Sequence, residues 1–174
     1  YIVFDVETPN SHNDRMSSIG VVVVEGQNVI QEYYTLINPE THFDPFNISL
    51  TGISPADVRD KPTFAEAWAE LAPIFSSGML IAHNAPFDMG FIRMACKNMD
   101  RPFTNVSIDT VAVSKAILTD IKNCKLDTVA KTGSIDANNH DGETYTQDED
   151  IVAGTCISEK TWKEVTYCFD CIAT

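Results

Sequence analysis

The sequence contains few basic residues. It has 12 Lys and Arg against 25 Asp and Glu, so the 174-residue chain carries a formal net charge of −13. A protein that binds nucleic acid by neutralising phosphates over a broad surface needs the opposite balance, and this class is disfavoured. An enzyme that acts on nucleic acid stays possible, because divalent ions in an acidic site supply positive charge locally.

The sequence also lacks an apolar run long enough to span a membrane and a signal-peptide pattern, so no membrane association is expected. Its five cysteines are odd in number and irregularly spaced, which indicates reduced thiols and a cytoplasmic location. Cys168 and Cys171 form a Cys-x-x-Cys pair, but no second pair completes a zinc site. The chain begins in an apolar run without a methionine, which favours a domain of a longer polypeptide.

The apolar content, 44% of the residues, suffices for the core of a single domain over residues 1–174. Short apolar runs bounded by turn residues predict five strands, at 1–8, 18–24, 29–37, 79–82 and 106–109. Helical spacing and capping residues predict four helices, at 63–75, 86–98, 110–118 and 126–131. The segment 41–62 between strands and helices is expected to be a loop. This order predicts an α/β domain with a central mixed sheet of about five strands flanked by helices.

The C-terminal part is harder to interpret. Residues 133–150 are polar and acidic without hydrophobic periodicity, which predicts an irregular acidic insertion that is functional or mobile. Beyond it, residues 150–157 favour a helix and residues 163–169 alternate somewhat like a strand.

Two acids close the first predicted strand. Side chains of a strand alternate between its faces, so Asp5 and Glu7 project from the same side and Val6 from the other. Two carboxylates held side by side repel each other unless a cation lies between them. A strand that simply reaches the surface would explain the same pattern equally well.

A second polar group stands where the predicted strand 79–82 leads into a helix. Asp88 falls in the first helical turn, where the helix dipole favours an acid, and this alone would explain it. The dipole does not explain the pair His83 and Asn84 directly after the C-terminal end of the strand. A third candidate is His140 within the acidic segment, since histidine accepts protons near neutral pH. A solvated loop is the ordinary interpretation of the acids around it.

Together these motifs resemble the DEDD 3′–5′ exonucleases, and specifically the DEDDh branch that includes bacterial proofreading exonucleases. The resemblance runs from residue 1 to residue 140 and is carried by five motifs: Asp5-Val6-Glu7-Thr8, His83-Asn84-Ala85-Pro86-Phe87-Asp88, the helix Leu126-Asp127-Thr128-Val129-Ala130 leading to His140, Asn38-Pro39, and Leu50-Thr51-Gly52-Ile53. It implies a ribonuclease-H-like fold, two bound Mg²⁺ or Mn²⁺ ions, and single-stranded DNA or RNA 3′ ends as substrate. It also implies a possible polymerase or other nucleic-acid-processing complex as partner.

Carried over by position, the resemblance implies that Asp5, Glu7 and Asp88 are metal ligands. It implies that Thr8, His83 and Asn84 contact the substrate and that His140 is the general base.

The family has an aspartate five residues after the histidine, but this chain has Tyr145 there. A longer turn would let Asp150 serve as the fourth ligand. Alternatively Asp170 serves, with Val165 at the histidine position, or Tyr145 replaces the histidine as base. We expect His140 to act with Asp150.

The function expected from this resemblance is hydrolysis of phosphodiester bonds from the 3′ end by a two-metal-ion mechanism. Two such ions clamp the attacking and leaving oxygens, and four carboxylates suit them as hard oxygen ligands. The alternative is a catalytically weakened domain that binds nucleic acid or serves as a scaffold in a larger complex. An endonuclease of similar fold is a weaker alternative. We further expect the segment 41–53, with Phe43, Phe46 and Leu50, to form one wall of the substrate groove.

Overall fold

The computed structural model describes residues 1–12, 14–26, 28–118 and 121–132. The acidic insertion predicted at 133–150, and the helix and strand predicted beyond it, lie outside the described residues. The structure therefore tests the domain as far as the helix that was expected at 126–131.

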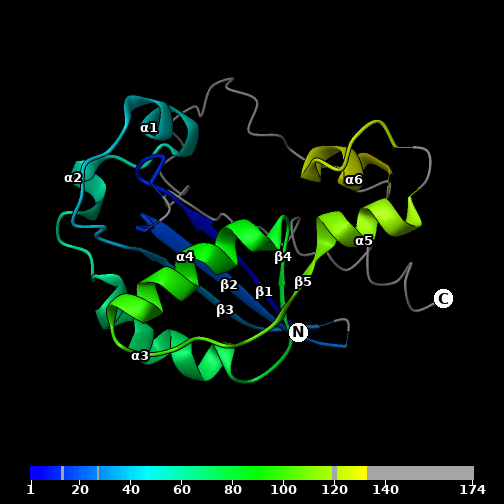
Figure 1. The fold of residues 1–174 in the computed structure, drawn as a ribbon, viewed down its shortest axis with the longest axis horizontal. Helices are drawn as coiled ribbons and strands as arrows, with labels where there is room; N and C mark the ends of the chain where they lie inside the picture. Colours follow the sequence, from blue (N-terminus) through cyan, green and yellow to red (C-terminus); the bar gives the residue numbers. More distant parts are fainter. Residues whose placement is uncertain (13, 27, 119–120, 133–174) are drawn as a thin grey trace.

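The centre of the fold is a five-stranded mixed sheet in the order β3-β2-β1-β4-β5 (Figure 1). Its strands are β1 (Ile2–Glu7), β2 (Ser18–Glu25), β3 (Asn28–Leu36), β4 (Leu80–Ala82) and β5 (Ser107–Asp109). The first three form an antiparallel meander, whereas β4 pairs in parallel with both β1 and β5. The mixed sheet predicted from the sequence is confirmed, and each strand lies within one or two residues of its predicted range.

Six helices are described: α1 (Pro45–Thr51), α2 (Pro55–Val58), α3 (Phe64–Phe75), α4 (Ala85–Asn98), α5 (Thr110–Ile117) and α6 (Leu126–Thr132). α3 and α4 cross one face of the sheet, α1 and α2 lie near the end of β1, and α5 and α6 lie on the side of β5 (Figure 1). The predicted capping box of α3 is present: the backbone N–H of Thr63 donates to Glu66 Oε2 at 2.7 Å. Across the described ranges no helix combines the length and apolarity that crossing a membrane requires.

The prediction of a loop over 41–62 is wrong, because α1 and α2 occupy much of it. Pro45 begins α1, and Gly52 ends it with a φ of 72°, a conformation that glycine adopts without strain. In α2 the side chains of Ser54 and Asp57 form a capping box around Pro55. At seven and four residues, both helices are too short to show a helical hydrophobic period.

Alternation along β1 divides its side chains between two apolar clusters. Ile2, Phe4 and Val6 pack with α3 and α4 in the larger cluster, in which Phe75 meets Phe4 edge to face at 5.2 Å between ring centroids. Val3 belongs to a smaller cluster on the opposite face, formed with β2 and β4. Asp5 and Glu7 lie two and four residues after Val3, so by alternation they point to the face of the smaller cluster. The two acids thus share one side of the strand, as predicted.

The parallel strands β1, β4 and β5 end at one edge of the sheet. At this edge the chain continues from β1 into the loop 8–12, from β4 into α4, and from β5 into α5. The two predicted polar groups, Asp5 with Glu7 and the His83–Asp88 motif, therefore meet in space although about 80 residues separate them.

Candidate active site

Three carboxyl groups converge where α4 begins beside the end of β1. Asp88 lies in the first turn of α4 and is only 2% exposed. Its Oδ1 accepts a hydrogen bond of 3.1 Å from the backbone N–H of Val6, which lies between Asp5 and Glu7 in the strand. Asp5 and Glu7 both interact electrostatically with Asp88. The structure thus brings together three of the four acids that the sequence predicted.

This convergence raises the pKa of the buried acids. Burial raises the pKa of Asp5 well above its ordinary value, and the charges of Asp88 and Glu7 raise it further. Burial also raises the pKa of Asp88 to about 7, against the opposing effect of the hydrogen bond from Val6. A hydrogen bond joins the two carboxyl groups, and it raises the pKa of Asp5 while lowering that of Asp88. Burial and mutual repulsion thus favour the protonated forms of both acids.

The donor set fits divalent ions such as Mg²⁺ or Mn²⁺, because carboxylate oxygens are their preferred protein ligands. Within the described ranges, however, no three His, Cys, Asp or Glu side chains are placed so that they would hold a metal ion. A divalent cation between these acids would relieve their repulsion.

His83 has both ring nitrogens engaged within the protein. Nε2 lies 2.9 Å from the carbonyl oxygen of Cys124 and must donate to it, because a carbonyl only accepts. Nδ1 lies 2.8 Å from the hydroxyl oxygen of Thr110, which also donates to the carbonyl oxygen of Ala82 at 3.4 Å. Burial lowers the pKa of His83, which favours the neutral ring. The predicted contact of His83 with substrate stays a prediction, and its observed contacts tie β4 to α5 and to the segment before α6.

Asn84 is exposed and adopts a left-handed backbone conformation, with φ 64° and ψ 45°. Asparagine adopts this region more readily than most residues other than glycine, so it suits a tight turn here. The turn lets the chain leave β4 and enter α4 so that Asp88 reaches β1. Asp109 supports it, because its Oδ1 accepts from the N–H groups of both Ala85 and Val111, at 3.2 and 3.1 Å. Asp109 thus joins the starts of α4 and α5, a role that sequence reasoning missed.

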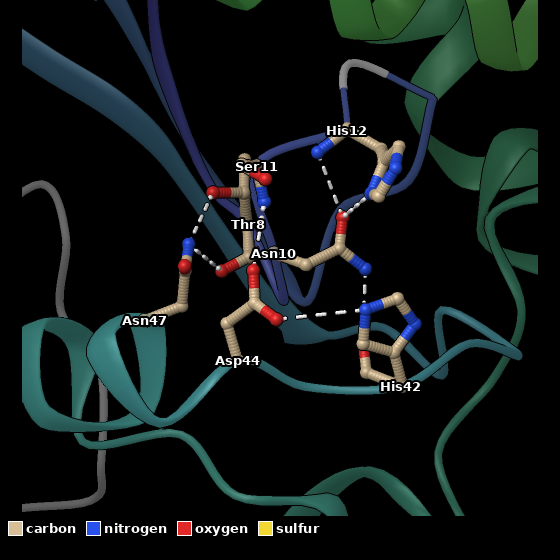
Figure 2. A network of polar contacts seen from close by, with 7 residues as sticks. All are labelled: Thr8, Asn10, Ser11, His12, His42, Asp44 and Asn47. Carbon is tan, nitrogen blue, oxygen red and sulfur yellow. Dashed lines mark hydrogen bonds and ion pairs between the residues drawn. The ribbon is translucent and has the colours of Figure 1, made fainter.

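Thr8 follows the acid pair directly and is held by Asn47, a residue of α1 that is 9% exposed. Asn47 Nδ2 lies 3.0 Å from both the carbonyl oxygen and Oγ1 of Thr8 (Figure 2). The carbonyl only accepts, so the amide nitrogen faces it and its second hydrogen is directed to Oγ1. The Thr8 hydroxyl therefore accepts from Asn47 and can donate its own hydrogen elsewhere. Sequence reasoning missed Asn47, because a single asparagine in a short helix gives no signal.

Further contacts hold the loop 8–12 against the start of α1 (Figure 2). Asn10 Nδ2 donates to the carbonyl oxygen of His42 at 2.9 Å, and the Asp44 backbone N–H donates to the carbonyl oxygen of Pro9 at 2.9 Å. The His42–Asp44 ion pair is largely exposed and adds little. These bonds make the loop after the acid pair and the helix α1 one unit.

α1 also presents apolar side chains to solvent. Phe46 is 73% exposed and Leu50 is 58% exposed, while Phe43 is partly buried. The structure leaves Phe46 and Leu50 accessible for contact with a ligand.

The remaining predicted site residues are His140 and Asp150, with Tyr145 and Asp170 as their alternatives. All four lie outside the described residues, as does the Cys168–Cys171 pair. The structure therefore does not test these assignments. His140 as base and Asp150 as fourth ligand stay predictions, with Tyr145 and Asp170 as the alternatives.

Comparisons with known proteins agree on one family. The RNase_T family model, described as exonuclease, matches residues 2–143. The PolC-type DNA polymerase III of Caldanaerobacter subterraneus subsp. tengcongensis is 33% identical over 133 residues, which cover 75% of this chain and 10% of that protein. The PolC-type DNA polymerase III of Clostridium perfringens is 34% identical over 143 residues, which cover 80% of this chain and 10% of that protein. The chain thus spans about a tenth of the length of these relatives.

Solved structures share the fold. Exonuclease X, in complex with 5′ overhanging duplex DNA, superimposes with a TM-score of 0.69 at 18% identity, covering 99% of this chain and 90% of that one. The nuclease domain of 3′hExo, a DEDDh family member bound to rAMP, superimposes with a TM-score of 0.67 at 16% identity. The match covers 81% of this chain and 82% of that one. The predicted ribonuclease-H-like fold is confirmed.

The raised pKa of Asp88 predicts how stability depends on pH without metal. The folded-state pKa of about 7 exceeds the ordinary value of 3.8, so stability falls as the pH rises through this range. Asp88→Asn removes the charge and keeps an oxygen for the Val6 N–H. In chelator at pH 8, we expect it to raise the free energy of unfolding by about 1–3 kcal/mol. At pH 4 we expect almost no gain. Thermal melts at both pH values measure the difference.

Asp60→Asn is the matched control, because Asp60 is an exposed acid in the connection between α2 and α3. It should leave the melting temperature unchanged at both pH values. A loss of stability in Asp88→Asn at pH 8 would contradict the electrostatic account of the three acids.

Proposed function

The chain belongs to the RNase_T exonuclease family, and on this premise we propose that it hydrolyses single-stranded DNA or RNA from the 3′ end. The observation that carries the proposal is the convergence of Asp5, Glu7 and Asp88 at the edge where β1 ends and α4 begins. Burying acids together costs stability, and a domain that only binds or serves as a scaffold gains nothing from that cost. The scaffold alternative is therefore disfavoured.

Asp5, Glu7 and Asp88, with Asp150 as fourth ligand, would hold two Mg²⁺ or Mn²⁺ ions. Bound there, such ions lower the pKa of an attacking water and stabilise charge on the departing 3′ oxygen. The chain's own residues supply the rest. Val6 orients Asp88 through its N–H, and Asn47 orients the Thr8 hydroxyl as a donor beside the acids. His140 accepts the proton of the water.

The remaining predicted site residues act at the same edge. Asn84 is exposed at the start of α4, where its side chain can contact the nucleotide. His83 positions the turn before α4 through its bonds to Thr110 and Cys124. Because the PolC-type relatives are polymerases, we further propose that the chain works within or beside a polymerase and corrects its 3′ ends.

The direct test is digestion of 5′-labelled single-stranded DNA and RNA with Mg²⁺ or Mn²⁺. We expect products that shorten from the 3′ end, and none in chelator. Asp5→Asn and Glu7→Gln should each lower the rate by orders of magnitude, since each removes a ligand charge, whereas Asp60→Asn should not change it. Gel electrophoresis of samples taken over time measures the lengths of the labelled products. Activity that persists in chelator, or internal cleavage only, would exclude the proposal.

The role of the C-terminal residues has its own test. A general base acts on the water in the transition state, so His140→Ala should lower kcat by about 10²–10⁴-fold with little change in KM. Asp150→Asn should instead weaken Mg²⁺ binding, measured as a higher metal concentration for half-maximal rate. Tyr145→Phe and Asp170→Asn are the matched controls. If either control shows the larger effect, the roles move to Tyr145 or Asp170.

Stacking on α1 can be tested at Phe46, whose side chain is 73% exposed on the helix that Asn47 joins to Thr8. Phe46→Ala should weaken binding of single-stranded DNA by about 1–3 kcal/mol, the range of one base–aromatic stack. The melting temperature should not change, because little surface is buried there. Ile30→Ala, at a 58% exposed residue of β3, is the control. Equal binding by wild type and Phe46→Ala would exclude the stack.

A further inference from the structure

The charge of the chain is unevenly distributed. Residues 110–132 contain four lysines and two aspartates, a formal charge of +2, in a chain whose total is −13. Lys115, Lys122 and Lys125 of this segment are exposed. A polyanion that approaches three converging carboxylates is repelled, so it needs cationic contacts nearby to reach them.

The backbone between two of these lysines contacts the turn that leads into the candidate active site. The carbonyl oxygen of Cys124 accepts from His83 Nε2 at 2.9 Å, and His83 lies in the turn between β4 and α4. Lys125 follows Cys124 directly in the chain, and Lys122 precedes it by two residues. Both lysines are therefore within a few residues of an atom that contacts the turn leading to Asp88.

The backbone that carries these lysines is anchored on both sides of Cys124. Asn123 Oδ1 accepts from the Lys125 N–H at 2.9 Å and from the Thr128 hydroxyl at 2.8 Å, which joins the segment to the start of α6. Cys124 is anchored to His83, and His83 to Thr110 at the start of α5. Cationic groups on a fixed backbone lose less conformational entropy on binding than groups on a free loop.

We propose that Lys122 and Lys125 form a docking surface for the phosphates of the nucleic acid strand, upstream of the bond at the active site. The segment between α5 and α6, which carries these lysines, lies on the side of β5, whereas α1 lies near the end of β1 (Figure 1). The strand therefore meets stacking groups on one side of the carboxylates and cationic groups on the other. The inference rests on the proposed function for the identity of the polyanion.

The test compares Lys122→Gln/Lys125→Gln with Lys97→Gln/Arg101→Gln. The second pair removes the same charge from the exposed Lys97 in the last turn of α4 and the exposed Arg101 that follows the helix, whereas Asp88 lies at its start. Binding of a 5′-fluorescein single-stranded oligonucleotide is measured by anisotropy with Mg²⁺ from 50 to 200 mM salt. An Asp5→Asn background, present in all variants, prevents cleavage.

Removing two phosphate contacts should make the slope of log K against log salt less steep by about 1.4, at roughly 0.7 per contact on a single strand. Affinity at 50 mM salt should fall about tenfold or more, and the control pair should match the parent. An unchanged slope, equal slopes in both pairs, or no binding by the parent would overturn the inference.

A second readout separates the inference from the proposed function. In the native background, hydrolysis of the p-nitrophenyl ester of thymidine 5′-monophosphate needs no upstream strand, so Lys122→Gln/Lys125→Gln should leave its kcat/KM unchanged. An equal loss on this small substrate would show that the lysines act on the active site instead, and would also overturn the inference. If the wild-type protein does not hydrolyse the ester, the proposed function is weakened. The slopes of log K against log salt still test whether Lys122 and Lys125 bind the strand.

Discussion

Repulsion among Asp5, Glu7 and Asp88 is the constraint on which the rest of this structure depends. The hydrogen bond from Val6 N–H holds Asp88 beside β1, and burial with mutual repulsion raises the pKa of both Asp5 and Asp88. A fold does not gain stability from such a cluster, because burial and like charges both disfavour the ionised forms. Cations bound among the acids would offset this cost, and the proposed function would then be linked to the stability of the domain.

The surrounding fold holds the acids at the meeting point of three strand ends. On one side, Asp109 and His83 join the starts of α4 and α5, so the turn at Asn84 cannot move independently of β5. On the other side, Asn47 joins α1 to the residue after the acid pair. The acids therefore lie between two units, one carrying exposed apolar groups and the other exposed lysines. Such an arrangement suits a single strand that must be stacked and neutralised while its end enters an acidic site.

The sequence predicted the sheet, because short apolar runs between turn residues are a local signature. Alternation in a strand puts Asp5 and Glu7 on one side, whereas the role of Asp88 came from the resemblance of its motif to the exonuclease family. The helices in 41–62 were missed, since they are too short for periodicity and only Pro45 and Gly52 mark α1. Asn47 and Asp109 were missed because their roles depend on contacts between distant segments. The positions of His140 and Asp150 stay predictions, since both lie outside the described residues.

The central claim is that the acids are electrostatically strained without metal, and the pKa of Asp88 tests it most directly. Carbon-13 NMR of the side-chain carboxyl group, followed from pH 4 to 9 in chelator, reports this pKa. The account predicts a midpoint near 7, because burial dominates over the stabilising hydrogen bond from Val6. Saturating Mg²⁺ should lower the midpoint, since the cation favours the ionised form. A midpoint near the ordinary value of 3.8, unaffected by Mg²⁺, would contradict the account.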